Sequence, residues 1–157
     1  MSSRSEALAT KFVQANDDLA TLIRAMPADD WRKVPAGEMR TVGVVAHHTA
    51  SGYLPLLSFA QMMANGQPLP HMAPGGLDEL NAREAVLHAN TSKEEVLGLL
   101  DANCRAVAAG LGNLTDKQLD TVADFFGQQM TVEGMLNGIL IGHTLEHVES
   151  MRAVMQA

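Results

Sequence analysis

The sequence predicts an all-α protein, folded as a four-helix bundle with longer connections. Three observations favour this class. Long segments carry apolar residues at the three- and four-residue spacing of an amphipathic helix. Aromatic residues make up 4 % of the 157 residues while ten residues are methionine, a composition that suits an aliphatic helical core. The chain has no internal repeat and no alternation of strands with helices, so we expect one helical domain over residues 1–157.

The first half of the chain predicts two long helices. The first covers about residues 3–26, and Pro27 ends it because proline cannot continue a helix. A connector with a short helical turn around Trp31 leads to the second helix, over about residues 41–65. Pro55 in the interior of this second helix should kink it or loosen one turn.

A long connection separates the second helix from the third. Residues 66–77 are rich in proline and glycine and are expected to form a loop, followed by a short helix over about residues 78–89. A capping box at Thr91 or Ser92, each with a glutamate three residues later, begins the next helix. Its apolar side continues to Leu111.

The chain between the third and the last long helix is less regular. The segment "TVADFFGQQM" is expected to hold an extended or hairpin-like excursion. The last helix begins near Thr131 and runs to the C-terminus. This order of elements gives four main helices with two longer connections.

The composition argues against several classes of partner and site. A net charge of −7 disfavours nucleic acid or an anionic membrane, since both need a basic patch. No run of ~18 apolar residues could span a membrane. The N-terminus lacks a hydrophobic signal core, so a cytoplasmic location is expected. Cys104 is the single cysteine, which excludes a disulfide framework or thiolate-rich zinc site, and its apolar helical neighbours predict a buried, inert thiol.

Two histidines in the last helix, His143 and His147, predict a metal site. Imidazoles four residues apart on a helix can converge on one ion at ~2.1 Å each. Steps of three and four residues place both on an otherwise apolar stripe. The stripe consists of Val132, Leu136, Leu140, His143, His147, Met151 and Val154. The alternative is that they are core histidines bonded to backbone carbonyls or polar neighbours.

A third ligand would have to come from another helix. In the second helix, His48 shares its line with apolar residues and is the better inward candidate, whereas His47 lies on a mixed face and is expected at the edge of the bundle. His71 falls in the loop and His88 in a polar helix, and neither is expected to have a function.

These residues carry a resemblance to the DinB/YfiT-like superfamily of metal-binding four-helix bundles. Trp31 and "GEMRTVGVVAHHTA" resemble its first signature, and "GHTLEHVESM" resembles its second. The resemblance implies a ligand set of His48, His143 and His147 for a divalent ion such as Zn²⁺ or Ni²⁺. Ser150 stands where the family often has a glutamine, which puts a dimer or supporting contact in question but leaves the ligand set unchanged.

The resemblance also implies a class of function. The superfamily includes mycothiol-dependent isomerases and bacillithiol transferases. We therefore expect a metal-dependent enzyme that acts on a small molecule by thiol transfer or by metal-assisted hydrolysis, with a low-molecular-weight thiol as a possible partner. Candidate acids or bases are Glu146 and Tyr53, whose alternatives are a solvated glutamate and a packing tyrosine. A homodimer is expected from the resemblance and from the apolar last helix.

Two other functions stay open. A non-catalytic bundle could use the metal to staple the second and last helices and serve as a stress-related or small-molecule binding protein. The third possibility is a bundle without metal, whose histidines are satisfied inside the protein. An open coordination position facing a cleft would favour the enzyme, and the flexible loop at 66–77 could flank such a cleft.

Overall fold

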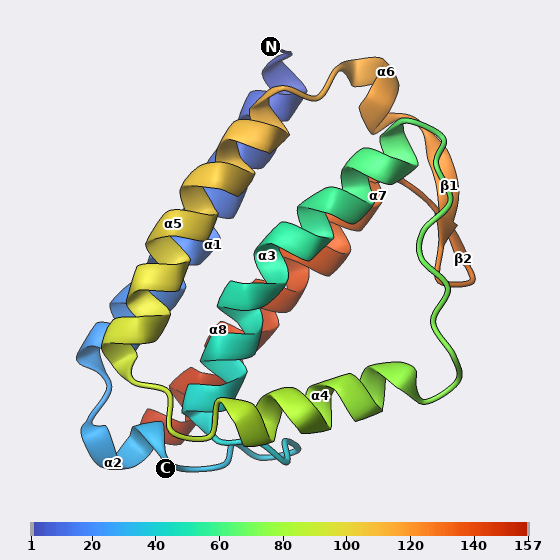
Figure 1. Cartoon of the computed structure of the whole chain (residues 1–157). Coiled ribbons are helices and arrows are strands. Elements are labelled where there is room, and N and C mark those ends of the chain that lie inside the picture. Colours follow the sequence, from blue (N-terminus) through green and yellow to red (C-terminus); the bar gives the residue numbers. More distant parts are fainter. Residues whose placement is uncertain (1, 157) are drawn as a thin grey trace.

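The computed structural model, which describes residues 2–156, is an all-α bundle of four long helical segments (Figure 1). Three of these segments are α1 (Ser3–Ala25), α3 (Val42–Ala64) and α5 (Lys93–Gly112). The fourth runs without a break as α7 (Val132–Met135), η1 (Leu136–Ile141) and α8 (Gly142–Gln156). Helix α5 packs against both α1 and α3, and the predicted fold class is confirmed.

Hydroxyl side chains fix where the long helices begin. Ser2, Thr41, Ser92 and Thr131 each accept a hydrogen bond from the backbone N–H three residues later. These bonds satisfy amide groups that a helix leaves without an internal partner at its first turn. Of the two predicted starts for α5, Ser92 is the N-cap, while the Thr91 hydroxyl donates to the Glu95 carboxylate at 3.0 Å.

Pro27 ends a helix as predicted, whereas Pro55 lies inside one. Helix α1 ends at Ala25, before Pro27, and the short helix α2 (Ala28–Trp31) supplies the expected turn around Trp31. Helix α3 is assigned as one helix through Pro55. Proline has no N–H, so the carbonyl of Ser51 lacks the usual helical partner at this turn.

A π-helical segment changes which face of the last helix is buried. In η1 the Gly142 N–H donates to the carbonyl of Asn137, five residues earlier. The wider turn takes up one extra residue, so the buried face continues from Leu140 to Thr144 and Val148. The expectation that His143 and His147 lie within the apolar core stripe is therefore wrong. Both lie outside the buried face of the last helix: His143 is exposed and His147 is half-buried.

The connection from α3 to α5 lies largely outside the core. Residues 65–75 form the loop, and α4 (Gly76–Leu87) begins about two residues earlier than predicted and crosses one end of the bundle (Figure 1). No residue of α4 is buried. Just beyond its end, the His88 ring stacks on the His47 ring of α3 with centroids 3.7 Å apart. This contact helps to hold α4 against the bundle.

The expected excursion before the last helix is a β-hairpin. After the short helix α6 (Asp116–Leu119), β1 (Val122–Phe125) pairs antiparallel with β2 (Gln128–Thr131), and Phe125 lies opposite Gln128. The two turn residues, Phe126 and Gly127, have φ of 47° and 95°. Positive φ at both positions is typical of a type I′ hairpin turn. The hairpin lies beside the end of α3 (Figure 1).

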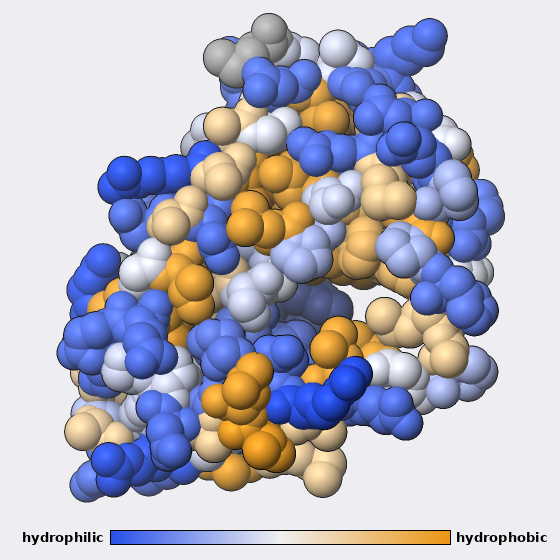
Figure 2. Space-filling view, in the orientation of Figure 1, coloured by the Kyte–Doolittle hydropathy of each residue, from blue (hydrophilic) through white to orange (hydrophobic). Residues whose placement is uncertain are grey.

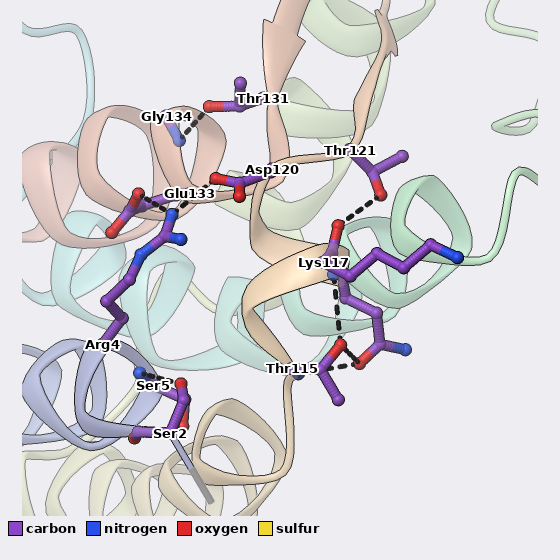
Figure 3. A network of polar contacts seen from close by, with 11 residues as sticks. Ser2, Arg4, Ser5, Thr115, Lys117, Asp120, Thr121, Thr131, Glu133 and Gly134 are labelled. Carbon is purple, nitrogen blue, oxygen red and sulfur yellow. Dashed lines mark hydrogen bonds and ion pairs between the residues drawn. The ribbon is translucent and has the colours of Figure 1, made fainter.

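An ion-pair network ties the N-terminus to the elements that flank this hairpin (Figure 3). The Arg4 guanidinium of α1 contacts Asp120, just after α6, at 2.7 Å. It also contacts Glu133 of α7 at 2.6 Å. Both ends of the hairpin are therefore fastened to the first turn of α1.

Candidate metal and ligand site

A large cleft opens between the bundle and the long connection (Figure 2). Its volume is about 1550 Å³, and its walls come from α3, the 66–75 loop, α4, the hairpin and the last helix. Figure 2 shows the surface hollowed between α4 and the bundle, with hydrophobic surface along the rim. The position of α4 away from the core creates this space, because the helix bridges the cleft and leaves its floor uncovered.

Three of the predicted site histidines line the cleft. His48 comes from α3, and His143 and His147 come from α8. The ring centroids of His48 and His147 lie 6.1 Å apart, and those of His143 and His147 lie 6.4 Å apart. The structure thus brings together side chains that are about a hundred residues apart in the sequence.

Burial favours the neutral form of two of these histidines. Burial, together with the nearby positive charge of Arg40, lowers the pKa of His48 to about 4. The pKa of His147 is lowered by the same two causes in the same order. Neutral imidazole is the form that binds metal ions, so both side chains have a lone pair available near pH 7.

The three rings do not yet form a closed cage. Within residues 2–156, no group of three or more His, Cys, Asp or Glu side chains is arranged closely enough to hold an ion. Rings bound to one tetrahedral ion would have centroids ~5 Å apart. The observed separations exceed this by roughly 1 Å, and His143 is exposed. The donor chemistry fits a divalent ion, and the rings would have to move closer together to hold one.

The two candidate acids or bases lie in different environments. Glu146 is exposed and lines the cleft beside His147, where it can reach a bound ligand. Tyr53 is 1 % exposed in the core, its hydroxyl donates to Asn16 at 3.2 Å, and its ring packs edge-on against Phe12. Burial raises the Tyr53 pKa well above its usual value. This position favours a packing role for Tyr53.

An arginine adds a positive charge to the histidine end of the cleft. Arg40 lines the cleft just before α3, and its guanidinium forms a two-pronged contact with Glu38. The Nε donates to Oε1 of Glu38 at 2.8 Å and an Nη donates to Oε2 at 3.0 Å. Glu38 also accepts the backbone N–H groups of Met39 and Arg40. These bonds hold the pKa of Glu38 at about 2 and fix the arginine in place.

The other end of the cleft is aromatic. Phe59 of α3 meets Phe125 and Phe126 of the hairpin, with ring centroids 6.3 Å and 5.5 Å away. The two hairpin rings are 5.0 Å apart. All three rings line the cleft, and the contacts are edge-to-face, a favourable geometry for aromatic pairs.

Comparison with known proteins identifies the family. The sequence model of the DinB superfamily matches residues 11–151. The chain belongs to the DinB superfamily. Searches of curated proteins and of solved structures found no match. Membership in the DinB superfamily supports a metal-binding helical protein, while the identity of the ligands and of the ion stays a prediction.

Of four other residues in this DinB chain, only His47 lies elsewhere than the sequence predicted. His47 is buried against His88 and not at the bundle edge, because the end of α4 covers it. His71, from the loop, lines the cleft. Cys104 is buried, as expected. Trp31 is buried as well, and its Nε1–H donates to the carbonyl of Thr91 at 3.0 Å, which makes it a structural plug.

The sequence interpretation missed Arg40 with Glu38 and the three phenylalanines. The sequence contains a recognisable feature for the charged pair and one for the hairpin phenylalanine. Glu38 and Arg40 stand two residues apart immediately before the helix N-cap at Thr41, within the first DinB signature. Phe126 precedes a glycine in a hairpin turn, where asparagine is the usual residue. Helical periodicity singles out the histidines, but it says nothing about residues before a helix or in a hairpin turn.

Proposed function

We propose that this protein is a divalent-metal-dependent enzyme that transfers a low-molecular-weight thiol to a small electrophile. His48, His143 and His147 would hold the ion. The observation that carries the proposal is their position together on the wall of a large open cleft, two of them in the neutral form. Three protein ligands leave room at the ion for a reactant, as in catalytic sites.

The size of the cleft favours transfer between two reactants. A pocket for one small molecule usually measures ~300–1,000 Å³. The cleft measures about 1550 Å³, enough for a thiol and an electrophile side by side. This comparison supports transfer as the first candidate.

The proposed step balances as a simple substitution. The thiol gives its proton to the Glu146 carboxylate, the sulfur forms a bond to the electrophilic carbon, and the leaving group departs with the electron pair of its bond. Glu146 is suited to this role because it lines the cleft and is exposed. A divalent ion such as Zn²⁺ or Ni²⁺ would supply positive charge that favours a thiolate over a thiol.

Metal-assisted hydrolysis is the second candidate, and the same carboxylate favours it. Glu146 faces solvent within the cleft and could take a proton from water, because a divalent ion held by the histidines would lower the pKa of that water. The two reactions differ in their need for a thiol. Hydrolysis would proceed in buffer alone, whereas transfer would require the added thiol and would consume it in equal amount.

Metal content is the first test. Tag-free protein, incubated with Zn²⁺ or Ni²⁺ and then desalted, is analysed by elemental mass spectrometry. We expect about one ion per chain in the parent and in a His71→Ala control, and a loss of most of the ion in His48→Ala. His71 is a fair control because it is a cleft histidine outside the proposed ligand set. Metal-free parent protein would overturn the proposal.

Activity then separates the remaining functions. The metal-loaded protein is assayed with cysteine as the thiol and with haloalkane and epoxide electrophiles, following loss of free thiol. We expect turnover that falls at least tenfold in Glu146→Gln and stays unchanged in Glu149→Gln, an exposed position on the same helix. A full complement of metal without any turnover would instead favour the non-catalytic metal-stapled bundle.

A further inference from the structure

The cleft has two chemically different ends along α3. The polar end contains Arg40, the three histidines and Glu146. The apolar end contains the three phenylalanines together with Met63 and Ile139. A cleft that is charged at one end and aromatic at the other matches a ligand with the same division.

Arg40 has donors left for such a ligand. Two of the five N–H groups of its guanidinium are used by Glu38. The others meet no protein acceptor within residues 2–156, and Arg40 is the only arginine or lysine among the cleft residues of that range. Glu38 holds the guanidinium in place at the cleft wall, and a planar carboxylate is the natural partner of its remaining donors.

The aromatic end carries a feature that packing alone does not require. Phe126 sits at φ 47°, in the left-handed region that bulky residues avoid. Asparagine or glycine would relieve this strain in a type I′ turn. Phe126 instead adds a ring to the cleft wall while it stays 43 % exposed. Strained backbone of this kind clusters at ligand sites.

The distance between the two ends of the cleft indicates how long the ligand must be. The charge of Arg40 acts on His48, so His48 marks the polar end of the cleft on α3, and Phe59 stands eleven residues after it. At 1.5 Å per residue this is ~16 Å along the helix. An unbranched chain of about twelve carbons spans a comparable length, whereas a compact small molecule would reach only one end.

We propose that the cleft binds an anionic amphiphile, with its carboxylate on Arg40 and its apolar chain on Phe59, Phe125 and Phe126. The inference rests on the proposed function only in placing the reactive part of this ligand near the histidines. Binding itself needs no metal. The substrate class of the enzyme would then be a carboxylate with a long apolar chain.

Dodecanoate is the probe for this site. Its affinity for the full chain is measured by isothermal titration calorimetry at pH 7.5, below its micelle concentration, with EDTA present and then with Zn²⁺ present. We expect binding in both conditions, at least tenfold tighter than for octanoate and for 1-dodecanol, and no binding of acetate. The shorter acid tests the chain subsite, and the alcohol tests the contribution of Arg40.

Two variants test the contribution of each end of the cleft to binding separately. Arg40→Gln should abolish the preference for dodecanoate over 1-dodecanol while the alcohol still binds. Phe126→Asn should weaken dodecanoate at least fivefold, with a thermal midpoint equal to or above that of the parent because asparagine suits the turn. Gln128→Asn, in the same hairpin but outside the cleft lining, should bind like the parent.

The outcomes are distinct from those of the metal test. Dodecanoate binding by a protein that holds no metal would retain this inference and remove the proposed enzyme. Equal affinity for dodecanoate and its alcohol, or unchanged affinity in Phe126→Asn, would overturn the inference whatever the metal content. Failure to bind dodecanoate in both EDTA and Zn²⁺ would overturn it as well.

Discussion

At the scale of single residues, the contact between Glu38 and Arg40 stabilises the fold and holds the arginine of the proposed ligand site. Four hydrogen bonds from Met39 and Arg40 converge on the Glu38 carboxylate and lower its pKa from 4.5 to about 2. The ionised carboxylate therefore stabilises the folded state above pH 4.5. This contribution declines as the pH falls from 4.5 towards 2.

The Glu38→Gln variant should show this pH dependence. Near pH 7 we expect a loss of about 1–2 kcal/mol in the free energy of unfolding, less than the full pKa shift implies because solvent screens the pair. The difference from the parent should shrink by pH 3, where the parent carboxylate begins to protonate. Urea unfolding at both pH values measures it. An equal difference at pH 7 and pH 3 would show that ionisation of Glu38 is not the cause.

Cys104 illustrates a thiol with no part in the chemistry. It is 7 % exposed, and burial raises its pKa to about 11, with further contributions from Asp17 and Asp101. Only the thiolate attacks a disulfide reagent. At pH 8 we expect Cys104 in folded protein to react with a chromogenic disulfide at least ~100-fold more slowly than in urea-unfolded protein. Comparable rates in the two states would contradict the burial of this side chain.

At the scale of elements, two glycines of α3 differ in what surrounds them. A Cβ atom at Gly43 would lie 2.7 Å from Nε1 of Trp31, whose indole is held by its hydrogen bond to Thr91. A Cβ at Gly52 would meet no atom within 4 Å. The absence of a side chain at Gly43 is therefore what lets α3 approach the Trp31 plug.

Alanine at these two positions should have opposite effects. Gly43→Ala is expected to destabilise the fold by about 1–3 kcal/mol through overpacking against Trp31. Gly52→Ala should stabilise it by up to about 1 kcal/mol, since alanine favours a helix interior. Urea unfolding gives both values, and the fluorescence of Trp31, the only tryptophan, should change in the first variant alone. A stable Gly43→Ala protein with parental fluorescence would refute the close contact.

At the scale of elements, some features of the helices could be predicted from the sequence and others could not. Helix ends were predictable because each depends on a local residue, such as Thr41 at an N-cap or Pro27 at a stop. The π-helical segment was not predictable from spacing. Four successive four-residue steps from Val132 to Val148 drift around an ordinary helix, and only the wider turn keeps them on one face. The four-residue spacing did predict that His143 and His147 lie close together, but they were placed on the wrong face.

At the scale of the whole molecule, the cleft depends on contacts between distant segments. The proline- and glycine-rich loop could be predicted to flank a cleft, but no local pattern brings α4 and the hairpin around α3, so the aromatic end could not be foreseen. Among residues 2–156, none of the helices has both the length and the apolar character that a membrane crossing requires. The composition and periodicity of the sequence did predict the bundle itself.

Oligomeric state is a whole-molecule prediction. Helix α4 leaves Val86 and Leu87 81 % and 72 % exposed, and exposed apolar side chains of this size favour association. We expect sedimentation equilibrium to give the mass of two 16.8 kDa chains. A single-chain mass at micromolar concentration would rule out the expected homodimer.

The Arg4 network described above has a consequence for the order in which the chain can assemble. Arg4 and Glu133 are separated by 129 residues, so their contact can form only after nearly the whole chain has been synthesised. Until then the hairpin that carries Phe125 and Phe126 has one of its anchors missing. The aromatic end of the cleft thus receives its full anchoring only late in synthesis, and a fusion at the N-terminus, close to Arg4, would affect this distant part of the sequence.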